Sequence, residues 1–156
     1  GRLVLLTGAS RGIGRRAAAR LAKLGATLAL TARSHDELAK LVAELKAVGA
    51  KAEAFPGDIT RPDDRERIVA GTVAAFGRLD VLVNCAGVCS FGEFSTSSEE
   101  VVRKVLEVNF FAPVELIRLC APHLSRSYEA GPDGWRPAVV NVASICGRWG
   151  IPSMSE

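Results

Sequence analysis

Apolar residues follow two alternating patterns along the chain. The first pattern is a short apolar or β-prone run, which is typical of a strand buried on both faces of a parallel sheet. Such runs occur at residues 3–7, 27–32, 51–55, 81–83 and 138–142. They predict five strands.

The second pattern places apolar residues three or four positions apart, which is typical of a helix with one buried face. It covers residues 13–24, 38–48 and 68–76, and a glycine directly follows each stretch. Glycine is favoured there because helices commonly end in a left-handed backbone conformation. These stretches predict three helices, one after each of the first three strands.

A longer helical region is predicted at about residues 98–125, with a boundary or kink at Pro113. Glycine and proline then predict a loop at residues 127–137. Strands that alternate with helices predict right-handed βαβ units and a parallel sheet. Because the 156 residues are 48% hydrophobic, they suffice for one core, and we expect a single α/β domain over residues 1–156.

The end of the first predicted strand carries the strongest candidate for chemistry. Residues 3–14 read LVLLTGASRGIG, so glycines follow an apolar run and precede a helical pattern. Glycine leaves the main chain without a Cβ, so a pyrophosphate can approach closely. The following helix then directs its unpaired N–H groups and its positive dipole end at that anion. Glycine also marks ordinary turns, but the strand and helix on either side favour a nucleotide site.

Charge and cysteine content narrow the function further. The net charge is +3 without a block of like charge, so nothing indicates nucleic-acid binding. Arginines and a lysine cluster at residues 15–23, where a solvated helix face is expected. No stretch approaches the roughly 20 apolar residues that span a bilayer. The four cysteines lack metal-ligand spacing, so we expect reduced thiols, no metal site and a cytoplasmic location.

Several short motifs, taken in order, resemble the short-chain dehydrogenase/reductase family. Residues 7–14, TGASRGIG, are similar to the family's TGxxxGxG turn, whose spacing differs from that of the extended, epimerase-like branch. Residues 84–87, NCAG, are similar to its NNAG segment, with Cys85 as a departure. The resemblance covers essentially the whole chain. It implies a Rossmann-type doubly wound parallel sheet with strand order 3-2-1-4-5, without the family's C-terminal strands.

The resemblance also implies which residues form the site. It implies cofactor binding by Gly8, Ser10, Arg11, Gly12, Ile13, Gly14, Arg33, Ser34, Asp58, Ile59, Asn84, Ala86 and Gly87. Asn109 is similar to the helix asparagine that holds a water relay, and Ser144 is similar to the serine that polarises the substrate. Simpler roles stay open: Asp58 as a turn or helix cap, Asn84 as a turn residue and Ser144 as a loop residue.

The residues after the second strand indicate which nicotinamide cofactor is bound. An acid that binds the ribose 2′-hydroxyl is expected about 20 residues past the glycine turn. Residues 31–34 are instead Thr, Ala, Arg and Ser. Arg33 can meet a 2′-phosphate with its planar guanidinium, Ser34 adds a hydroxyl, and Arg11 adds a second positive charge. We therefore expect NADP(H) rather than NAD(H); the alternative is that Arg33 is a solvated loop cation.

In the family, a tyrosine that transfers the substrate proton follows the serine by thirteen residues, and a lysine four residues later lowers its pKa. Counting from Ser144 puts this tyrosine at position 157, beyond Glu156. Tyr128, expected in the loop before the fifth strand, cannot replace it. We therefore expect the chain to be the N-terminal part of a longer enzyme and to be inactive alone. The alternative is a short form that binds nucleotide without turnover.

These residues favour an NADP(H)-dependent carbonyl reductase or alcohol dehydrogenase that acts on a small molecule and, when complete, forms a homodimer or homotetramer. The substrate is open, and Phe91, Phe94, Ile145, Cys146 and Trp149 are candidates for its pocket. The alternatives are a catalytically inactive nucleotide-binding regulatory or scaffold module and a purely structural interaction domain. An unpaired fifth strand predicts that the chain alone is marginally stable or self-associates.

Overall fold

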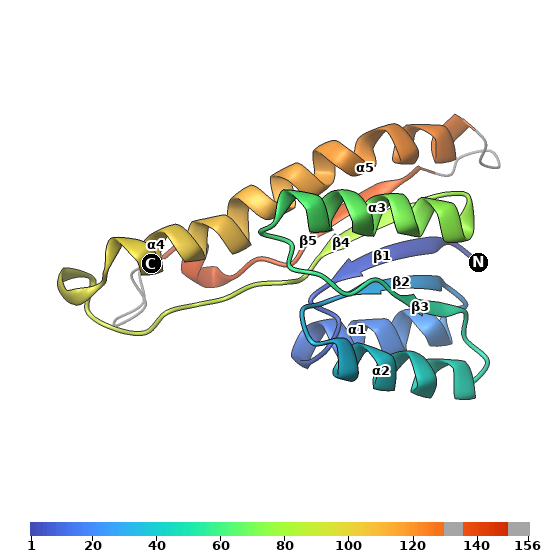
Figure 1. Ribbon diagram of the computed structural model, residues 1–156, viewed down its shortest axis with the longest axis horizontal. Helices are drawn as coiled ribbons and strands as arrows, with labels where there is room; N and C mark the ends of the chain where they lie inside the picture. The colour runs from blue at the N-terminus through green and yellow to red at the C-terminus, as the bar shows by residue number, and fades with distance from the viewer. Residues whose placement is uncertain (130–135, 150–156) are drawn as a thin grey trace.

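A parallel five-stranded sheet forms the centre of the structure, a computed structural model that describes residues 1–129 and 136–149 (Figure 1). The strands are β1 (Leu3–Thr7), β2 (Thr27–Thr31), β3 (Ala52–Ala54), β4 (Val81–Asn84) and β5 (Ala138–Asn141). Their order in the sheet is β3-β2-β1-β4-β5, and every neighbouring pair is parallel. The predicted doubly wound α/β fold and its strand order are therefore confirmed.

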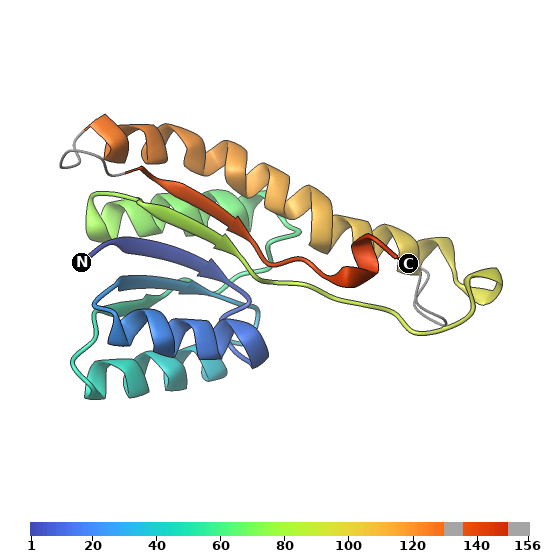
Figure 2. The same cartoon turned by 180° about the vertical axis from the view of Figure 1, so that it is seen from behind.

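Helices cover both faces of this sheet. α1 (Gly12–Lys23) and α2 (His35–Ala47) lie on one face, and α3 (Pro62–Phe76) and α5 (Ala112–Glu129) lie on the other (Figures 1 and 2). Each face buries its own apolar cluster, one around Leu28, Leu38 and Leu41, the other around Ile68 and Leu116. Because the central strands are buried on both sides, they read as apolar runs in the sequence.

The register of β1 fixes the position of the site. Leu5 lies opposite Ala29 of β2 on one side and Leu82 of β4 on the other. From β1 the chain passes to β2 and β3 on one side, and it reaches the other side of β1 only at β4. The loops after β1 and β4 therefore diverge at this point. Crevices that bind ligands in open α/β sheets lie at such a reversal of strand order, at the carboxyl ends of the strands.

The helical region predicted at 98–125 is longer and less regular in the structure. After a short 3-10 helix (Phe94–Thr96), it consists of α4 (Glu99–Leu106), a π-helical segment (Glu107–Phe111) and then α5. Ser98 caps α4, since its Oγ accepts a hydrogen bond from the N–H of Val101 at 3.3 Å. Pro113 does not end the helix. It lies in the first turn of α5, directly after the wider π-helical hydrogen-bonding pattern, where a residue without an N–H is tolerated.

The predicted loop at 127–137 starts too early, and the placement of Tyr128 in it was wrong. α5 runs through Glu129 and includes Tyr128. The helix continues because Leu116, Cys120, Leu124 and Ser127 form one buried stripe at helical spacing. Glycine and proline at residues 131–137 predict a loop but not the residue at which it begins, and Ser127 is buried with the other three. The remainder of the predicted loop, residues 130–135, lies outside the described residues.

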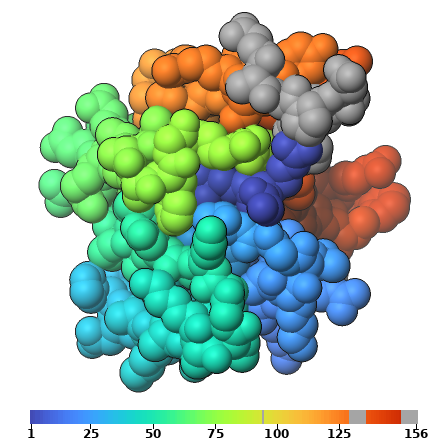
Figure 3. Space-filling model, turned by 90° about the vertical axis from the view of Figure 1, so that its right-hand side faces the viewer, coloured from blue at the N-terminus to red at the C-terminus, as the bar shows by residue number. Residues whose placement is uncertain are grey.

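The side of the molecule that carries β5 is apolar and exposed. Within the described residues β5 pairs only with β4, and all four of its residues are exposed. Large exposed apolar side chains of α4, the π-helical segment, α5, β5 and the residue after β5 are Leu106, Phe110, Phe111, Val114, Tyr128, Val139, Val140 and Val142. In Figure 3 the segment that follows β5, coloured red, projects beyond the rest of the chain. Within residues 1–129 and 136–149, no helix is long and apolar enough to cross a membrane.

Candidate functional site

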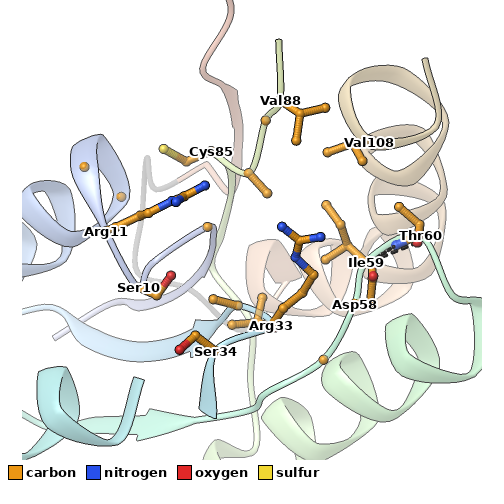
Figure 4. A pocket seen from close by; sticks show the side chains of 18 of the residues that line it. Ser10, Arg11, Arg33, Ser34, Asp58, Ile59, Thr60, Cys85, Val88 and Val108 are labelled. Carbon is orange, nitrogen blue, oxygen red and sulfur yellow. Dashed lines mark hydrogen bonds between the residues drawn. The ribbon is translucent and has the colours of Figure 1, made fainter. Parts of the chain in front are cut away.

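A cavity of about 900 Å³ lies at the carboxyl ends of the central strands (Figure 4). Its walls come from the loops after β1, β2, β3 and β4, from the first turn of α2, and from residues 104, 107 and 108 of α4 and the π-helical segment. All the residues predicted to bind a cofactor line this cavity, except Asn84. Segments that are up to a hundred residues apart in the sequence thus meet at one site.

Glycines allow the main chain to pack closely at the turn after β1. A Cβ on Gly14 would lie 2.2 Å from the carbonyl oxygen of Gly8, and a Cβ on Gly8 would lie 2.7 Å from Cα of Ala86. Neither contact is possible for a side chain, so the glycines bring β1, α1 and the loop after β4 together. The sequence motif predicted glycines here for the approach of a pyrophosphate, and the structure shows that Gly8 and Gly14 also allow close main-chain packing.

The turn opens onto the N-terminus of α1. Gly12, the first residue of α1, has a φ of +54°, and a Cβ there would have no described atom within 4 Å. The side chain of the N-cap residue Arg11 makes no capping hydrogen bond among the described residues, and the first turn of α1 holds no acidic residue. The first N–H groups of α1 and its positive dipole end therefore face an open space. This arrangement fits a diphosphate.

Thr7 connects this turn to the loop after β4. Its buried Oγ1 accepts hydrogen bonds from the N–H groups of Cys85 and Ala86, both at 3.0 Å. The hydroxyl thus ties the ends of β1 and β4 together beneath the cavity. The motif alone predicts no separate role for Thr7; a polar residue at the end of a fully apolar run is the signal that indicates one.

Two arginines supply positive charge at one side of the cavity. Arg11 and Arg33 are both exposed cavity residues, and Figure 4 shows their guanidinium groups pointing into it. Within the described part of the chain neither forms an ion pair. The same wall also holds Glu37, whose carboxylate pairs with Lys40 at 3.1 Å. The residues directly after β2 include no acid, and Glu37 was not predicted as a site residue. It lines the cavity because the first turn of α2 borders it.

Asp58 and Ile59 form the opposite wall. Oδ1 of Asp58 accepts hydrogen bonds from the N–H (3.0 Å) and the hydroxyl (2.8 Å) of Thr60, so the simpler turn role proposed for Asp58 is present in the structure. The N–H of Asp58 donates to Asp64 at 2.8 Å, and this bond, together with Arg67, holds the pKa of the Asp64 carboxyl below its usual range. The loop is thereby fixed against the start of α3.

A buried cation fixes the same loop from the other side. Nη1 of Arg65 donates to the carbonyl oxygen of Ile59 at 2.7 Å, and Arg65 is itself buried. Figure 4 shows Ile59 on the side of the cavity that also carries Val88 and Val108. These three side chains form an apolar wall that suits a flat ring.

Three predicted site residues lie off the cavity wall. Asn109, in the π-helical segment, holds the loop after β4, because its amide accepts from the N–H of Val88 at 3.0 Å and donates to its carbonyl at 2.8 Å. Nδ2 of the buried Asn84 donates to Oδ1 of Asn141 at 2.9 Å. Ser144 is exposed, and its Oγ accepts from the N–H of Cys146 at 3.2 Å. The structure brings Asn109, but not Ser144, into contact with a cavity-lining segment.

The aromatic and aliphatic candidates for a substrate pocket are not part of this cavity. Phe91, Ile145, Cys146 and Trp149 are absent from its walls, and the side chain of Phe94 lies outside the described part of the chain. Phe91 and Trp149 are 71% and 63% exposed. Their sequence positions near the site were therefore insufficient to place them in one pocket.

Cys85 lines the cavity at the position where the family resemblance implies asparagine. Burial raises the pKa of its thiol, so the neutral form is favoured there. The chain's four cysteines are all free, and among the described residues no group of three His, Cys, Asp or Glu side chains could hold a metal ion.

Known proteins share the sequence pattern of this chain. The sequence model of a family described as short chain dehydrogenase matches residues 2–156. An L-rhamnose 1-dehydrogenase (NAD(P)(+)) of Sphingomonas is 36% identical over 146 residues, which is 93% of this chain and 55% of that protein. The chain spans about half the length of the curated relatives it matches.

Solved structures resemble the fold over almost the whole chain. A metagenomic short-chain oxidoreductase in complex with NADP is 34% identical, with a TM-score of 0.88 over 98% of this chain and 66% of that one. A short-chain dehydrogenase/reductase from Burkholderia phymatum in complex with NAD is 30% identical, with a TM-score of 0.89 over 99% of this chain and 53% of that one.

Proposed function

Because the chain belongs to the short-chain dehydrogenase/reductase family, we propose that it is the cofactor-binding part of an oxidoreductase that transfers a hydride between NADP(H) and a carbonyl or alcohol substrate. The acid-free N-terminus of α1, opening onto the cavity behind a glycine turn, is the observation that carries this proposal. Bare main-chain N–H groups at a helix start suit the diphosphate of a dinucleotide.

Different segments of the chain bind different parts of the coenzyme. The turn at residues 8–14 holds the diphosphate, and the apolar wall of Ile59, Val88 and Val108 takes the adenine ring beside Asp58. The nicotinamide supplies the hydride chemistry when the coenzyme is bound. Cys85, Ala86 and Gly87 line the side of the cavity formed by the loop after β4, which Thr7 and Asn109 hold in place.

A preference for NADP(H) is the finer part of the proposal. Arg11 and Arg33 direct unpaired positive charge into the cavity, and Ser34 adds a hydroxyl at its edge. Similar proteins are described with NADP, with NAD or with either, so the preference rests on these side chains of this chain. A 2′-phosphate carries about two negative charges near neutral pH and forms strong hydrogen bonds with guanidinium groups.

A coenzyme titration tests this proposal. We expect NADPH to bind the folded chain more tightly than NADH, measured by nucleotide fluorescence and by calorimetry. The double substitution Ala32→Asp and Arg33→Gln removes the cation and supplies a ribose acceptor, and it should shift the preference toward NADH. A folded chain that binds neither coenzyme contradicts the proposed function, whereas equal preference before and after the substitutions contradicts only the NADP(H) assignment.

For catalysis we propose that Ser144 polarises the substrate oxygen and that Asn109 holds a water relay, in an enzyme whose proton-transferring tyrosine would follow at position 157. The second candidate, a binding module without redox activity, is favoured by one observation: Ser144 lies off the cavity wall and bonds the backbone of Cys146. Incubation of the complete NADPH-bound protein with a panel of ketones and aldehydes separates the two, because only an enzyme oxidises NADPH in a substrate-dependent manner.

Assembly and location complete the proposal. The exposed apolar residues along α5 and β5 support a homodimer or homotetramer for the complete protein. The four unpaired thiols support a reducing, cytoplasmic compartment.

A further inference from the structure

The starts of the two helices that border the cavity differ in charge. The first turn of α1 has no acidic residue, as expected where an anion binds. The first turn of α2 carries two, Asp36 and Glu37. Carboxylates at a helix start compensate its positive dipole end, so α2 attracts a further anion less strongly than α1 does.

Of these two acids, only Glu37 lines the cavity. It lies four residues after Arg33 and three after the N-cap residue Ser34, so the cation, the hydroxyl and the carboxylate share one corner of the site. Arg33 forms no ion pair within the described residues, and Glu37 pairs with Lys40, on the outer side of the helix turn, at 3.1 Å. Glu37 thus lines the cavity with a carboxylate whose charge Lys40 partly neutralises.

We propose that Glu37 is a residue that determines coenzyme selectivity, by opposing a 2′-phosphate and by offering an acceptor to a free 2′-hydroxyl. The inference rests on the proposed function, since it assumes that a dinucleotide occupies the cavity. Arg11 and Arg33 attract the 2′-phosphate, and Glu37 weakens that attraction, so the preference for NADPH over NADH is smaller than the two arginines alone would give. Lys40 tunes the balance, because it neutralises part of the carboxylate charge.

Removal of this one charge tests the proposal. We expect Glu37→Gln to raise the affinity for NADPH relative to NADH by about two- to fivefold, the range for a single half-exposed charge pair. Dissociation constants for both coenzymes are measured by nucleotide fluorescence at low and at high salt. The shift should shrink at high salt, because the charges are reached by solvent ions.

Asp36→Asn is the matched control, because it removes the same charge from the same helix turn but outside the cavity wall. It should leave the ratio of the two affinities unchanged. Lys40→Gln exposes the Glu37 charge and should shift the ratio toward NADH, and this shift should vanish when Glu37→Gln is also present.

The outcomes separate this inference from the proposed function. If the folded parent chain binds neither coenzyme, the proposed function fails and the inference fails with it. If both coenzymes bind but Glu37→Gln leaves the affinity ratio unchanged, or Asp36→Asn moves it equally, the inference alone is overturned. Circular dichroism of each variant establishes that it is folded before its affinities are compared.

Discussion

Gly12 shows how a single residue joins backbone geometry to binding. Its φ of +54° is unfavourable for a residue with a Cβ, and Gly12 lines the cavity. We expect Gly12→Ala to lower the free energy of unfolding by about 1 kcal/mol and to weaken NADPH binding at least tenfold, roughly 1.4 kcal/mol. Thermal unfolding and coenzyme titration measure the two effects.

Gly77 provides the control for this prediction. It ends α3 with a φ of +73°, and a Cβ there would also meet no described atom within 4 Å, but it lies outside the cavity. Gly77→Ala should show a similar loss of stability with unchanged binding. If both variants bind NADPH like the parent chain, the diphosphate does not lie against Gly12.

Cys120 makes stability depend on pH. Burial raises the pKa of its thiol from 9.0 to about 12. Between these values the unfolded chain loses the thiol proton while the folded chain keeps it. The free energy of unfolding should therefore fall as pH rises from about 9 to about 12, by roughly 1.4 kcal/mol per unit.

Urea unfolding at pH 8.5 and 10.5 under reducing conditions tests this, with Cys120→Ala as the comparison. The variant has a lower stability at both pH values because a core side chain is truncated, but it should lose less stability between them. Other groups that titrate in this range are shared by the two proteins. Equal losses would show that Cys120 does not titrate as described.

At the scale of elements, Asp80 holds the starting ends of β1 and β4 together. Its carboxylate is completely buried, with Oδ2 accepting from the N–H of Leu3 at 2.7 Å and Oδ1 accepting from Nη2 of Arg78 at 2.6 Å. Asp80→Asn replaces one acceptor with a donor and leaves Arg78 without its charged partner. We expect the free energy of unfolding to fall by about 2 kcal/mol in urea titrations.

Glu53→Gln is the control for this prediction, since Glu53 is an exposed acid on β3. Its effect should stay within about 0.5 kcal/mol. A loss at Asp80 as small as this would mean that the strands are held by their main-chain bonds alone.

The elements also show what the sequence could and could not predict. β1 has the predicted bounds, and the other strands differ from prediction by one or two residues. The central strands β1, β2 and β4 are buried on both faces and therefore leave uninterrupted apolar runs. The predicted end of this helix near residue 125 was too early, because the glycines and prolines further along do not show where the helix stops and the buried Ser127 still belongs to it. The π-helical turn was not predicted either, since one extra residue in a turn does not alter the apolar spacing enough to be recognised.

The candidate site also contains residues that the sequence predicted and residues that it did not. The glycine turn was predictable because its glycines lie within a few residues of one another, between a strand and a helix that are both legible in the sequence. Glu37 was not, since its place at the cavity depends on how α2 sits against the sheet. The roles of Ser144 and Asn109 stay predictions.

At the scale of the whole molecule, one apolar side is left uncovered. Val140 of β5 and Phe111 at the end of the π-helical segment are 46% and 51% exposed, and the outer edge of β5 has no partner among the described residues. We expect the chain to self-associate at tens of micromolar concentration, as measured by size-exclusion chromatography with light scattering.

Val140→Lys combined with Phe111→Glu should return the protein to a monomer. Val48→Lys serves as the control, because Val48 is more exposed than either but lies at the end of α2, away from this side. A parent chain that is monomeric and unfolds cooperatively would contradict the prediction.

The two apolar clusters lie on opposite faces of the sheet and are separated by its strands. Residues from both helical layers line the cavity. The turn at residues 8–14 and the start of α2 belong to the layer of α1 and α2, and the loop at residues 57–60, which leads into α3, belongs to the layer of α3 and α5. A ligand in the cavity would contact both layers across the carboxyl edge of the sheet. A bound ligand would thus restrict the motion of both layers at once, including parts of each layer that it does not contact.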